Sequence, residues 1–171
     1  MAEDEDRIRT RQELLDESFL GVMRQGKASV RVTTSKFPSF TSVECMYRSP
    51  DGCRCGIGQL IPDAAYRPSF EGRGVRWLVY DPEQFPRVSA LRDGTPLDEF
   101  VDGRSPFAKE VKANVELLER LQGAHDQAAG DGLAGDAAPP TPEEFIAQFR
   151  RNCTGVAWDF NLLDPNRLLP V

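Results

Sequence analysis

The sequence predicts an α+β fold in which helices pack on a small antiparallel sheet built around a β-hairpin. Two long stretches repeat apolar residues at helical spacing, and a shorter stretch alternates apolar and polar residues before a strong turn signal. The 171 residues are 40% apolar and 28% charged, as in one ordinary domain. A chain of this length buries about 70% of its extended surface on folding, so a disulfide or metal ion is not needed for stability.

The amino-terminal part predicts one helix and one strand. Residues 6–25 repeat apolar side chains at three- and four-residue spacing, and Gly26 is a typical helix stop. Residues 28–34 are rich in β-branched side chains and indicate a short strand. The acidic residues 1–5 are expected to be disordered.

A β-hairpin is expected over residues 43–57. Residues 43–47 alternate in polarity and run into Ser49-Pro50-Asp51-Gly52, where proline presets one turn position and glycine supplies a positive φ. With that turn, Tyr47 opposes Cys55. Residues 56–61, which contain two glycines, indicate a helical turn or a close backbone contact, and the composition of residues 75–80 indicates another strand.

The carboxy-terminal half predicts two helices separated by a loop. Residues 106–128 carry a continuous apolar face that includes His125. Residues 127–140 are mainly Ala, Gly, Asp and Pro and predict a mobile loop. A further helix should begin after Thr141, with Glu144 completing a capping box.

The charge distribution argues against nucleic acid and membranes as partners. The chain has a net charge of −6, which disfavours nonspecific binding to duplex DNA. Residues 21–76 form a basic island of nine basic and four acidic residues, and we expect it to face the acidic remainder of the molecule rather than nucleic acid. Four of the first six residues are acidic, where a signal peptide needs basic residues, and no apolar run is long enough to span a membrane, so we expect a cytoplasmic protein with no membrane partner.

One candidate catalytic set consists of Cys55, His125 and Asp126. Cys55 stands at the expected start of a helix, where a thiol ionises more easily. If His125 came within hydrogen-bond reach, with Asp126 or Asp159 orienting it, Cys55 and His125 would form a cysteine nucleophile and its base. The opposing interpretation is that His125 packs in the core or caps the helix.

Metal binding is the second possibility. Cys45, Cys53 and Cys55 share one face of the predicted hairpin, and His125 or Cys153 could complete a four-ligand zinc site. Same-face positions on a strand lie about 7 Å apart. This spacing disfavours a single metal ion bound by neighbouring thiols, and it also disfavours a Cys45–Cys55 disulfide. We therefore expect no cofactor, with a structural zinc ion as the alternative.

A carboxylate cluster is the third possibility. Asp63, Glu71 and Asp126 could bind a divalent cation through oxygen ligands if the fold brought them together. Each also has a local explanation at the end or start of a helix or in a turn.

The hairpin region also supports a resemblance. The stretch from Cys45 to Gly52, the stretch from Cys55 to Asp63, and Tyr66 with Glu71-Gly72 resemble a family of small uncharacterised proteins encoded by bacteria and their phages. The later Leu121-Gln122-Gly123-Ala124-His125-Asp126 is similar to a Leu-Gln-x-x-His-Asp element of the same family. The resemblance spans about residues 12–160 and implies no particular activity. The positions that match its pattern are Cys45, Cys55, Asp63, Tyr66, Glu71, His125 and Asp126.

These observations favour a small intracellular accessory or interaction protein that acts by binding another protein and is encoded by a phage or mobile element. Asp63, Tyr66 and Glu71 are its candidate binding residues. The alternative is a cysteine-dependent hydrolase or transferase that uses Cys55 with His125 and Asp126.

Overall fold

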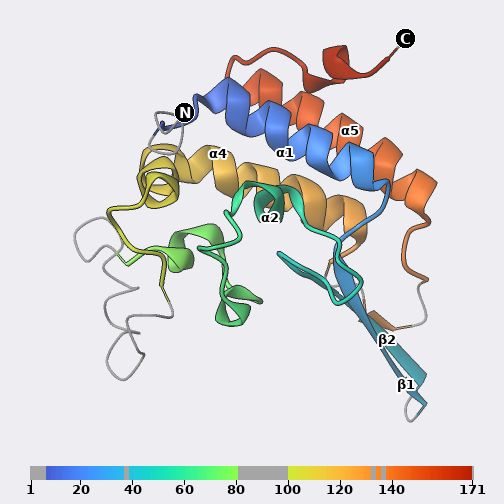
Figure 1. Cartoon of the computed structure of the whole chain (residues 1–171). Helices are drawn as coiled ribbons and strands as arrows, with labels where there is room; N and C mark the ends of the chain where they lie inside the picture. Colours follow the sequence, from blue (N-terminus) through green and yellow to red (C-terminus); the bar gives the residue numbers. More distant parts are fainter. Residues whose placement is uncertain (1–6, 37–38, 81–99, 132–133, 136–137, 171) are drawn as a thin grey trace.

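The computed structural model in Figure 1 describes residues 7–36, 39–80, 100–131, 134–135 and 138–170. These residues form an α+β fold that is mostly helical, with four α-helices beside an antiparallel hairpin, as the sequence predicts. None of the helices described here is long and apolar enough to cross a membrane.

Helix α1 spans Arg11–Gln25 and begins and ends at recognisable signals. The Thr10 side chain accepts the N–H of Glu13 while the Glu13 carboxylate accepts the N–H of Thr10, so two free donors of the first turn are satisfied. Gly26 ends the helix with a φ of 74°, the left-handed conformation that glycine adopts most readily. The predicted stop is confirmed.

The sheet is built from β1, Val30–Lys36, and β2, Ser39–Cys45. They pair antiparallel, with Val30 opposite Cys45, and Ala134–Gly135 (β3) pairs with the other edge of β2. The main hairpin therefore precedes the one predicted over residues 43–57. That prediction is wrong in its second strand because the chain enters a helix directly after Cys55.

The predicted turn is nevertheless present. Gly52 has a φ of 83°, and the amide N–H of Cys55 donates to the carbonyl oxygen of Tyr47 at 3.2 Å, so Tyr47 opposes Cys55 as expected. Only one isolated bridge, between Arg48 and Arg54, forms around this turn.

Helix α2, Gly56–Leu60, confirms the helical turn expected there. Residues 75–80 differ from the prediction, because Val75–Leu78 is a 3-10 helix and only Val79 makes a strand-like bridge, to Val101. Val75 and Leu78 are both buried, and a 3-10 helix places residues three apart on one side. β-Branched composition alone was therefore misleading.

The two predicted carboxy-terminal helices are α4, Pro106–Ala129, and α5, Pro142–Asp159. Thr141 and Glu144 form the expected capping box. α4 extends into the predicted loop at residues 127–140, and two residues of that loop form β3. Residues 132–133 and 136–137 of this loop, and residues 1–5, lie outside the described residues.

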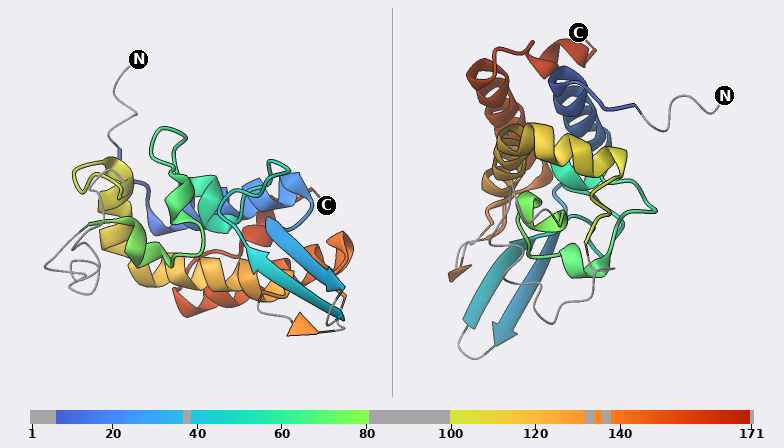
Figure 2. Two further views of the ribbon diagram at one scale, coloured as in Figure 1. Left: turned by 90° about the horizontal axis from the view of Figure 1, so that it is seen from below. Right: turned by 90° about the vertical axis from the view of Figure 1, so that its left-hand side faces the viewer.

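The core lies between α1, α4 and α5, which run alongside one another in Figure 1. Phe19, Phe145 and Phe149 are fully or almost fully buried there and stack on one another. α2 packs on α1 and α4. Figure 2 shows that the β1–β2 hairpin extends away from this helical body, and we call it the arm.

Candidate functional site: a thiol, an imidazole and a carboxylate beside a small cavity

The fold brings three chemically active side chains together. Cys45 is the last residue of β2, and His125 and Asp126 lie near the end of α4. One ligand atom from each lies within 4.8 Å of the others, and among the described residues this is the only such group of three or more. The structure therefore places His125 and Asp126 around Cys45, whereas the sequence analysis had paired them with Cys55.

His125 is fully buried, and its ring and both ring nitrogen atoms have neighbours in the fold. Its ring packs edge-on against Phe145 and Phe149, with centroids 5.2 and 6.2 Å away. Its Nε2 atom accepts the backbone N–H of Ser29 at 3.3 Å, so we assign the proton of the neutral ring to Nδ1. Nδ1 lies 3.4 Å from the Oδ1 atom of Asp126. The predicted packing of His125 in the core is confirmed.

The Cys45 thiol is surrounded by carboxylates. Its sulfur lies within 4.8 Å of an oxygen of Asp126, and its backbone N–H donates to Asp131 at 2.9 Å. Burial, together with the negative charges of Asp126 and Asp131, raises the pKa of the Cys45 thiol far above its ordinary value. The thiol is therefore protonated at neutral pH and is a poor nucleophile in this state.

Cys55 caps α2 with its sulfur, which accepts the N–H of Gly58 at 3.2 Å. Burial and the negative charge of Asp126 raise the pKa of the Cys55 thiol to about 12, although the N–H groups of Gly58 and Ile57 favour the thiolate. The expectation that this helix start makes the thiol easy to ionise is wrong. The cost of burying a thiolate exceeds the stabilisation by two N–H groups of a five-residue helix.

Both thiols border a cavity of about 300 Å³. Asp126, Gln122 and Tyr47 line it as well. The Tyr47 hydroxyl donates to the carbonyl oxygen of Arg73, which also lines this cavity, at 2.6 Å. The hairpin and the end of α4 therefore share a common hollow, with Asp126 reaching it and His125 sealed behind.

The other two thiols lie elsewhere, and all four are free. Cys53 interacts with Lys27 and Asp51, and Cys153 is buried in α5, where burial raises its pKa to about 12. The predicted zinc ligands are not gathered, because within the described part of the chain only Cys45 joins His125 and Asp126. Cys53 does not line the cavity that Cys45 and Cys55 share.

Glu71, a predicted binding residue, is saturated by donors from the chain. Its carboxylate accepts the N–H of Tyr47 at 2.8 Å, the N–H of Arg48 at 2.9 Å and the hydroxyl of Tyr66 at 2.8 Å. Burial and this hydrogen bond to Glu71 raise the pKa of Tyr66 to about 12. The Arg48 guanidinium stacks on the Tyr66 ring at 4.3 Å. These contacts hold the loop 62–73 against the hairpin.

Asp63 lies at the outer end of the same network. It is exposed and pairs with Arg48 at 2.8 Å and Arg54 at 2.9 Å. The predicted cation site of Asp63, Glu71 and Asp126 does not assemble, since the searched residues bring only Asp126 into a metal-sized group. Asp63 and Glu71 instead neutralise and order nearby arginine and backbone groups.

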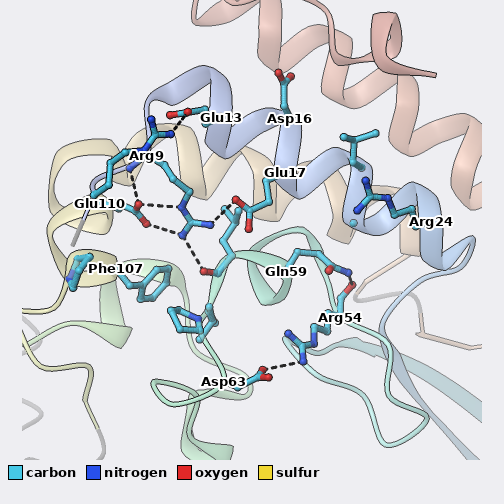
Figure 3. A pocket seen from close by; sticks show the side chains of 17 residues that line it. Arg9, Glu13, Asp16, Glu17, Arg24, Arg54, Gln59, Asp63, Phe107 and Glu110 are labelled. Carbon is cyan, nitrogen blue, oxygen red and sulfur yellow. Dashed lines mark hydrogen bonds and ion pairs between the residues drawn. The ribbon is translucent and has the colours of Figure 1, made fainter. Parts of the chain in front are cut away.

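A larger cavity, with a volume of about 860 Å³, lies between α1, α2 and the start of α4, and Figure 3 shows the side chains that line it. Arg9 crosses it and binds Glu110 at 2.7 Å, Glu17 at 2.8 Å and the carbonyl oxygen of Leu60 at 3.0 Å. The charges that line this cavity largely neutralise one another. No local pattern could reveal the pairing of Arg9 with the buried Glu110, because the two residues are 101 positions apart.

The comparisons add no relative from which a function could be transferred. The resemblance to small bacterial and phage proteins therefore stays a prediction. No protein-family model, curated protein or solved structure matches this chain.

Proposed function

We propose that this chain is a small cytoplasmic accessory protein that binds a protein partner by adding an extended segment of that partner to the open edge of β1. The observation that carries the proposal is the arm itself. A two-stranded ribbon is marginally stable on its own, and this one extends from the helical body (Figures 1 and 2), with the two-residue β3 paired to the far edge of β2.

The exposure of β1 is continuous. All five residues from Arg31 to Ser35 are exposed, so both faces of this part of the strand are accessible to solvent. Val32 retains 46% exposure and is one of the few large apolar side chains so exposed. β1 also stands at the end of the strand order, with β2 as its only strand neighbour among the described residues.

The register identifies the backbone groups that are available on the open edge. The N–H of Met46 donates to the carbonyl oxygen of Ser29, and in an antiparallel ladder the bonded pairs recur at every second residue. Arg31 and Thr33 therefore bond to β2, and the N–H and C=O groups of Val32 and Thr34 face outward. An extended segment can pair with these groups.

The two faces of the strand indicate what the partner segment should contain. Val32 shares a face with the buried Val43 of β2, while Arg31 lies on the opposite face beside Glu44. The best match is a segment with β-branched or aromatic residues on the Val32 side and polar or acidic residues on the Arg31 side. The occupant that we propose is such an alternating segment of another protein.

Other properties agree with this proposal. The four free cysteines suit the reducing cytoplasm. Encoding by a phage or mobile element is part of the proposal and is supported by the resemblance alone. The cysteine-enzyme alternative lacks similar support, because both thiols at the small cavity have raised pKa values.

The test is a peptide selection against the purified chain, followed by affinity measurements on one selected peptide by fluorescence anisotropy. Val32→Pro removes an outward N–H without removing a bond to β2, so it should weaken binding at least about tenfold. Val32→Thr keeps the N–H and the β-branched shape and should retain most of the affinity. Circular dichroism controls for folding.

Two outcomes would overturn the proposal. Equal affinity of the Val32→Pro variant and the wild type would show that the peptide does not pair with β1. A wild-type dimer that dissociates in the Val32→Pro variant, measured by light scattering, would show that a second copy of this chain occupies the edge.

A further inference from the structure

We propose that Cys45, His125 and Asp126 form a zinc-binding site with one coordination position open to the 300 Å³ cavity. This inference is independent of the proposed function, because the three side chains lie at the base of the arm and not on its open edge.

The distances fit the coordination sphere of zinc. Zinc binds imidazole nitrogen and carboxylate oxygen at about 2.0–2.2 Å, and two ligand atoms of a tetrahedral site then lie roughly 3.4 Å apart. The Nδ1 atom of His125 and the Oδ1 atom of Asp126 are 3.4 Å apart. Since all three ligand atoms lie within 4.8 Å of one another, a movement of about 1 Å brings the Cys45 sulfur to its bonding distance.

The donor set selects the metal. A thiolate with an imidazole and a carboxylate suits zinc, whereas magnesium and calcium prefer oxygen ligands alone. Contacts beyond the ligands already orient them. Asp131 accepts the backbone N–H of Cys45, and Phe145 and Phe149 fix the imidazole ring.

The fourth position has a defined direction. Cys45 and Asp126 both line the cavity, while His125 is fully buried behind them. Three protein ligands with a fourth position that faces a cavity leave room for water or a small ligand on the metal. A closed structural site would instead require a fourth protein ligand.

Binding changes the protonation of two ligands in a definite way. The Cys45 thiol loses its proton to solvent when the sulfur–zinc bond forms. On His125, the proton leaves Nδ1 and a proton is taken up at Nε2, so the ring stays neutral and one proton is released per zinc ion. The N–H of Ser29 then loses the acceptor that it has in this structure, and its peptide must move.

The test uses Co²⁺ as a spectroscopic probe for zinc, followed by displacement with Zn²⁺. The wild type and the control Cys53→Ser should each bind one Co²⁺ with a thiolate-to-metal charge-transfer band, and Cys45→Ser should lack the band. Asp126→Asn removes the negative charge of a ligand, so it should weaken binding by at least about 10- to 100-fold, the loss typical of a residue that only orients a ligand. Circular dichroism of each variant separates lost binding from lost folding.

Nuclear magnetic resonance provides a second measurement that does not depend on a variant. The ring of His125 should change from the Nδ1-protonated to the Nε2-protonated form on addition of Zn²⁺, and the amide signal of Ser29 should shift. An absent band in the wild type, an equal band in Cys45→Ser, or an unchanged His125 ring in the presence of excess Zn²⁺ would overturn the proposal.

Discussion

Replacement of Gly58 by alanine tests the contact between α2 and the hairpin. A Cβ atom on Gly58 would lie 1.9 Å from the carbonyl oxygen of Tyr47 and 2.8 Å from its carbonyl carbon. An ordinary carbon–oxygen contact is about 3.3 Å, so the two segments must separate by roughly 1.4 Å. That movement breaks the 3.2 Å hydrogen bond from Cys55 to Tyr47 and disturbs the bond from Tyr47 to Glu71.

The expected cost follows from these contacts. Two weakened hydrogen bonds at about 1 kcal/mol each, with about 1–3 kcal/mol for overpacking, give a loss of about 3–5 kcal/mol in the free energy of unfolding. Urea denaturation followed by circular dichroism measures it. Gly123→Ala is the matched control, because its Cβ would meet nothing within 4 Å in α4 and should stabilise the chain by about 0.5–1 kcal/mol. A loss below about 1 kcal/mol for Gly58→Ala would refute this account of the contact.

Three further results are expected. Glu71→Gln should lower the free energy of unfolding by about 2 kcal/mol in urea denaturation, because an amide cannot accept all three donors, and Tyr66→Phe should cost only about 1 kcal/mol. Iodoacetamide at pH 7 should leave Cys55 and Cys153 unlabelled in the folded chain, since the pKa of each thiol is about 12, and rapid labelling detected by mass spectrometry would contradict this. Hydrogen bonds from Thr10 and the nearby Arg7 hold the pKa of Glu13 at about 2. Because this pKa is depressed, the stabilisation is present above pH 4.5 and is lost as the pH falls towards 2, and Glu13→Gln should flatten that part of the stability–pH curve.

Local signals predicted the helices well. Gly26 ends α1, and Thr141 with Glu144 starts α5, as predicted, because a helix end must satisfy its own free backbone groups with nearby residues. The start of α1 was predicted at residue 6, but the helix begins at Arg11, because the capping box of Thr10 and Glu13 fixes its first turn there. The pairing of β1 with β2 was missed. Residues 28–34 were recognised as a strand, but the strand that ends at Cys45 had two possible partners, residues 28–34 before it and the segment after the turn. Only the start of a helix at Gly56 removes the second partner.

The candidate site was predicted in part. His125 and Asp126 could be identified from the sequence, and both lie beside the thiol of Cys45. A helix start favours a thiolate and therefore pointed to Cys55 rather than Cys45, but no sequence pattern shows that Cys55 is almost fully buried. The Ser29–His125 bond links positions 96 residues apart, and no periodicity or spacing encodes such a contact.

The arm and the proposed zinc site meet at Ser29 and Cys45. Ser29 directly precedes β1 and donates to His125, and Cys45 ends β2 and carries the proposed sulfur ligand. When zinc binds, the Nε2 atom of His125 no longer accepts the N–H of Ser29. The backbone at Ser29, directly before β1, must therefore change its conformation. By thermodynamic linkage, any factor by which zinc changes the dissociation constant of an arm-bound peptide is also the factor by which the peptide changes that of zinc. Anisotropy titrations of the selected peptide with and without Zn²⁺ should show this factor in the wild type and no zinc effect in Cys45→Ser. An identical peptide affinity in both conditions would show that the base of the arm does not transmit the change in the His125 ring.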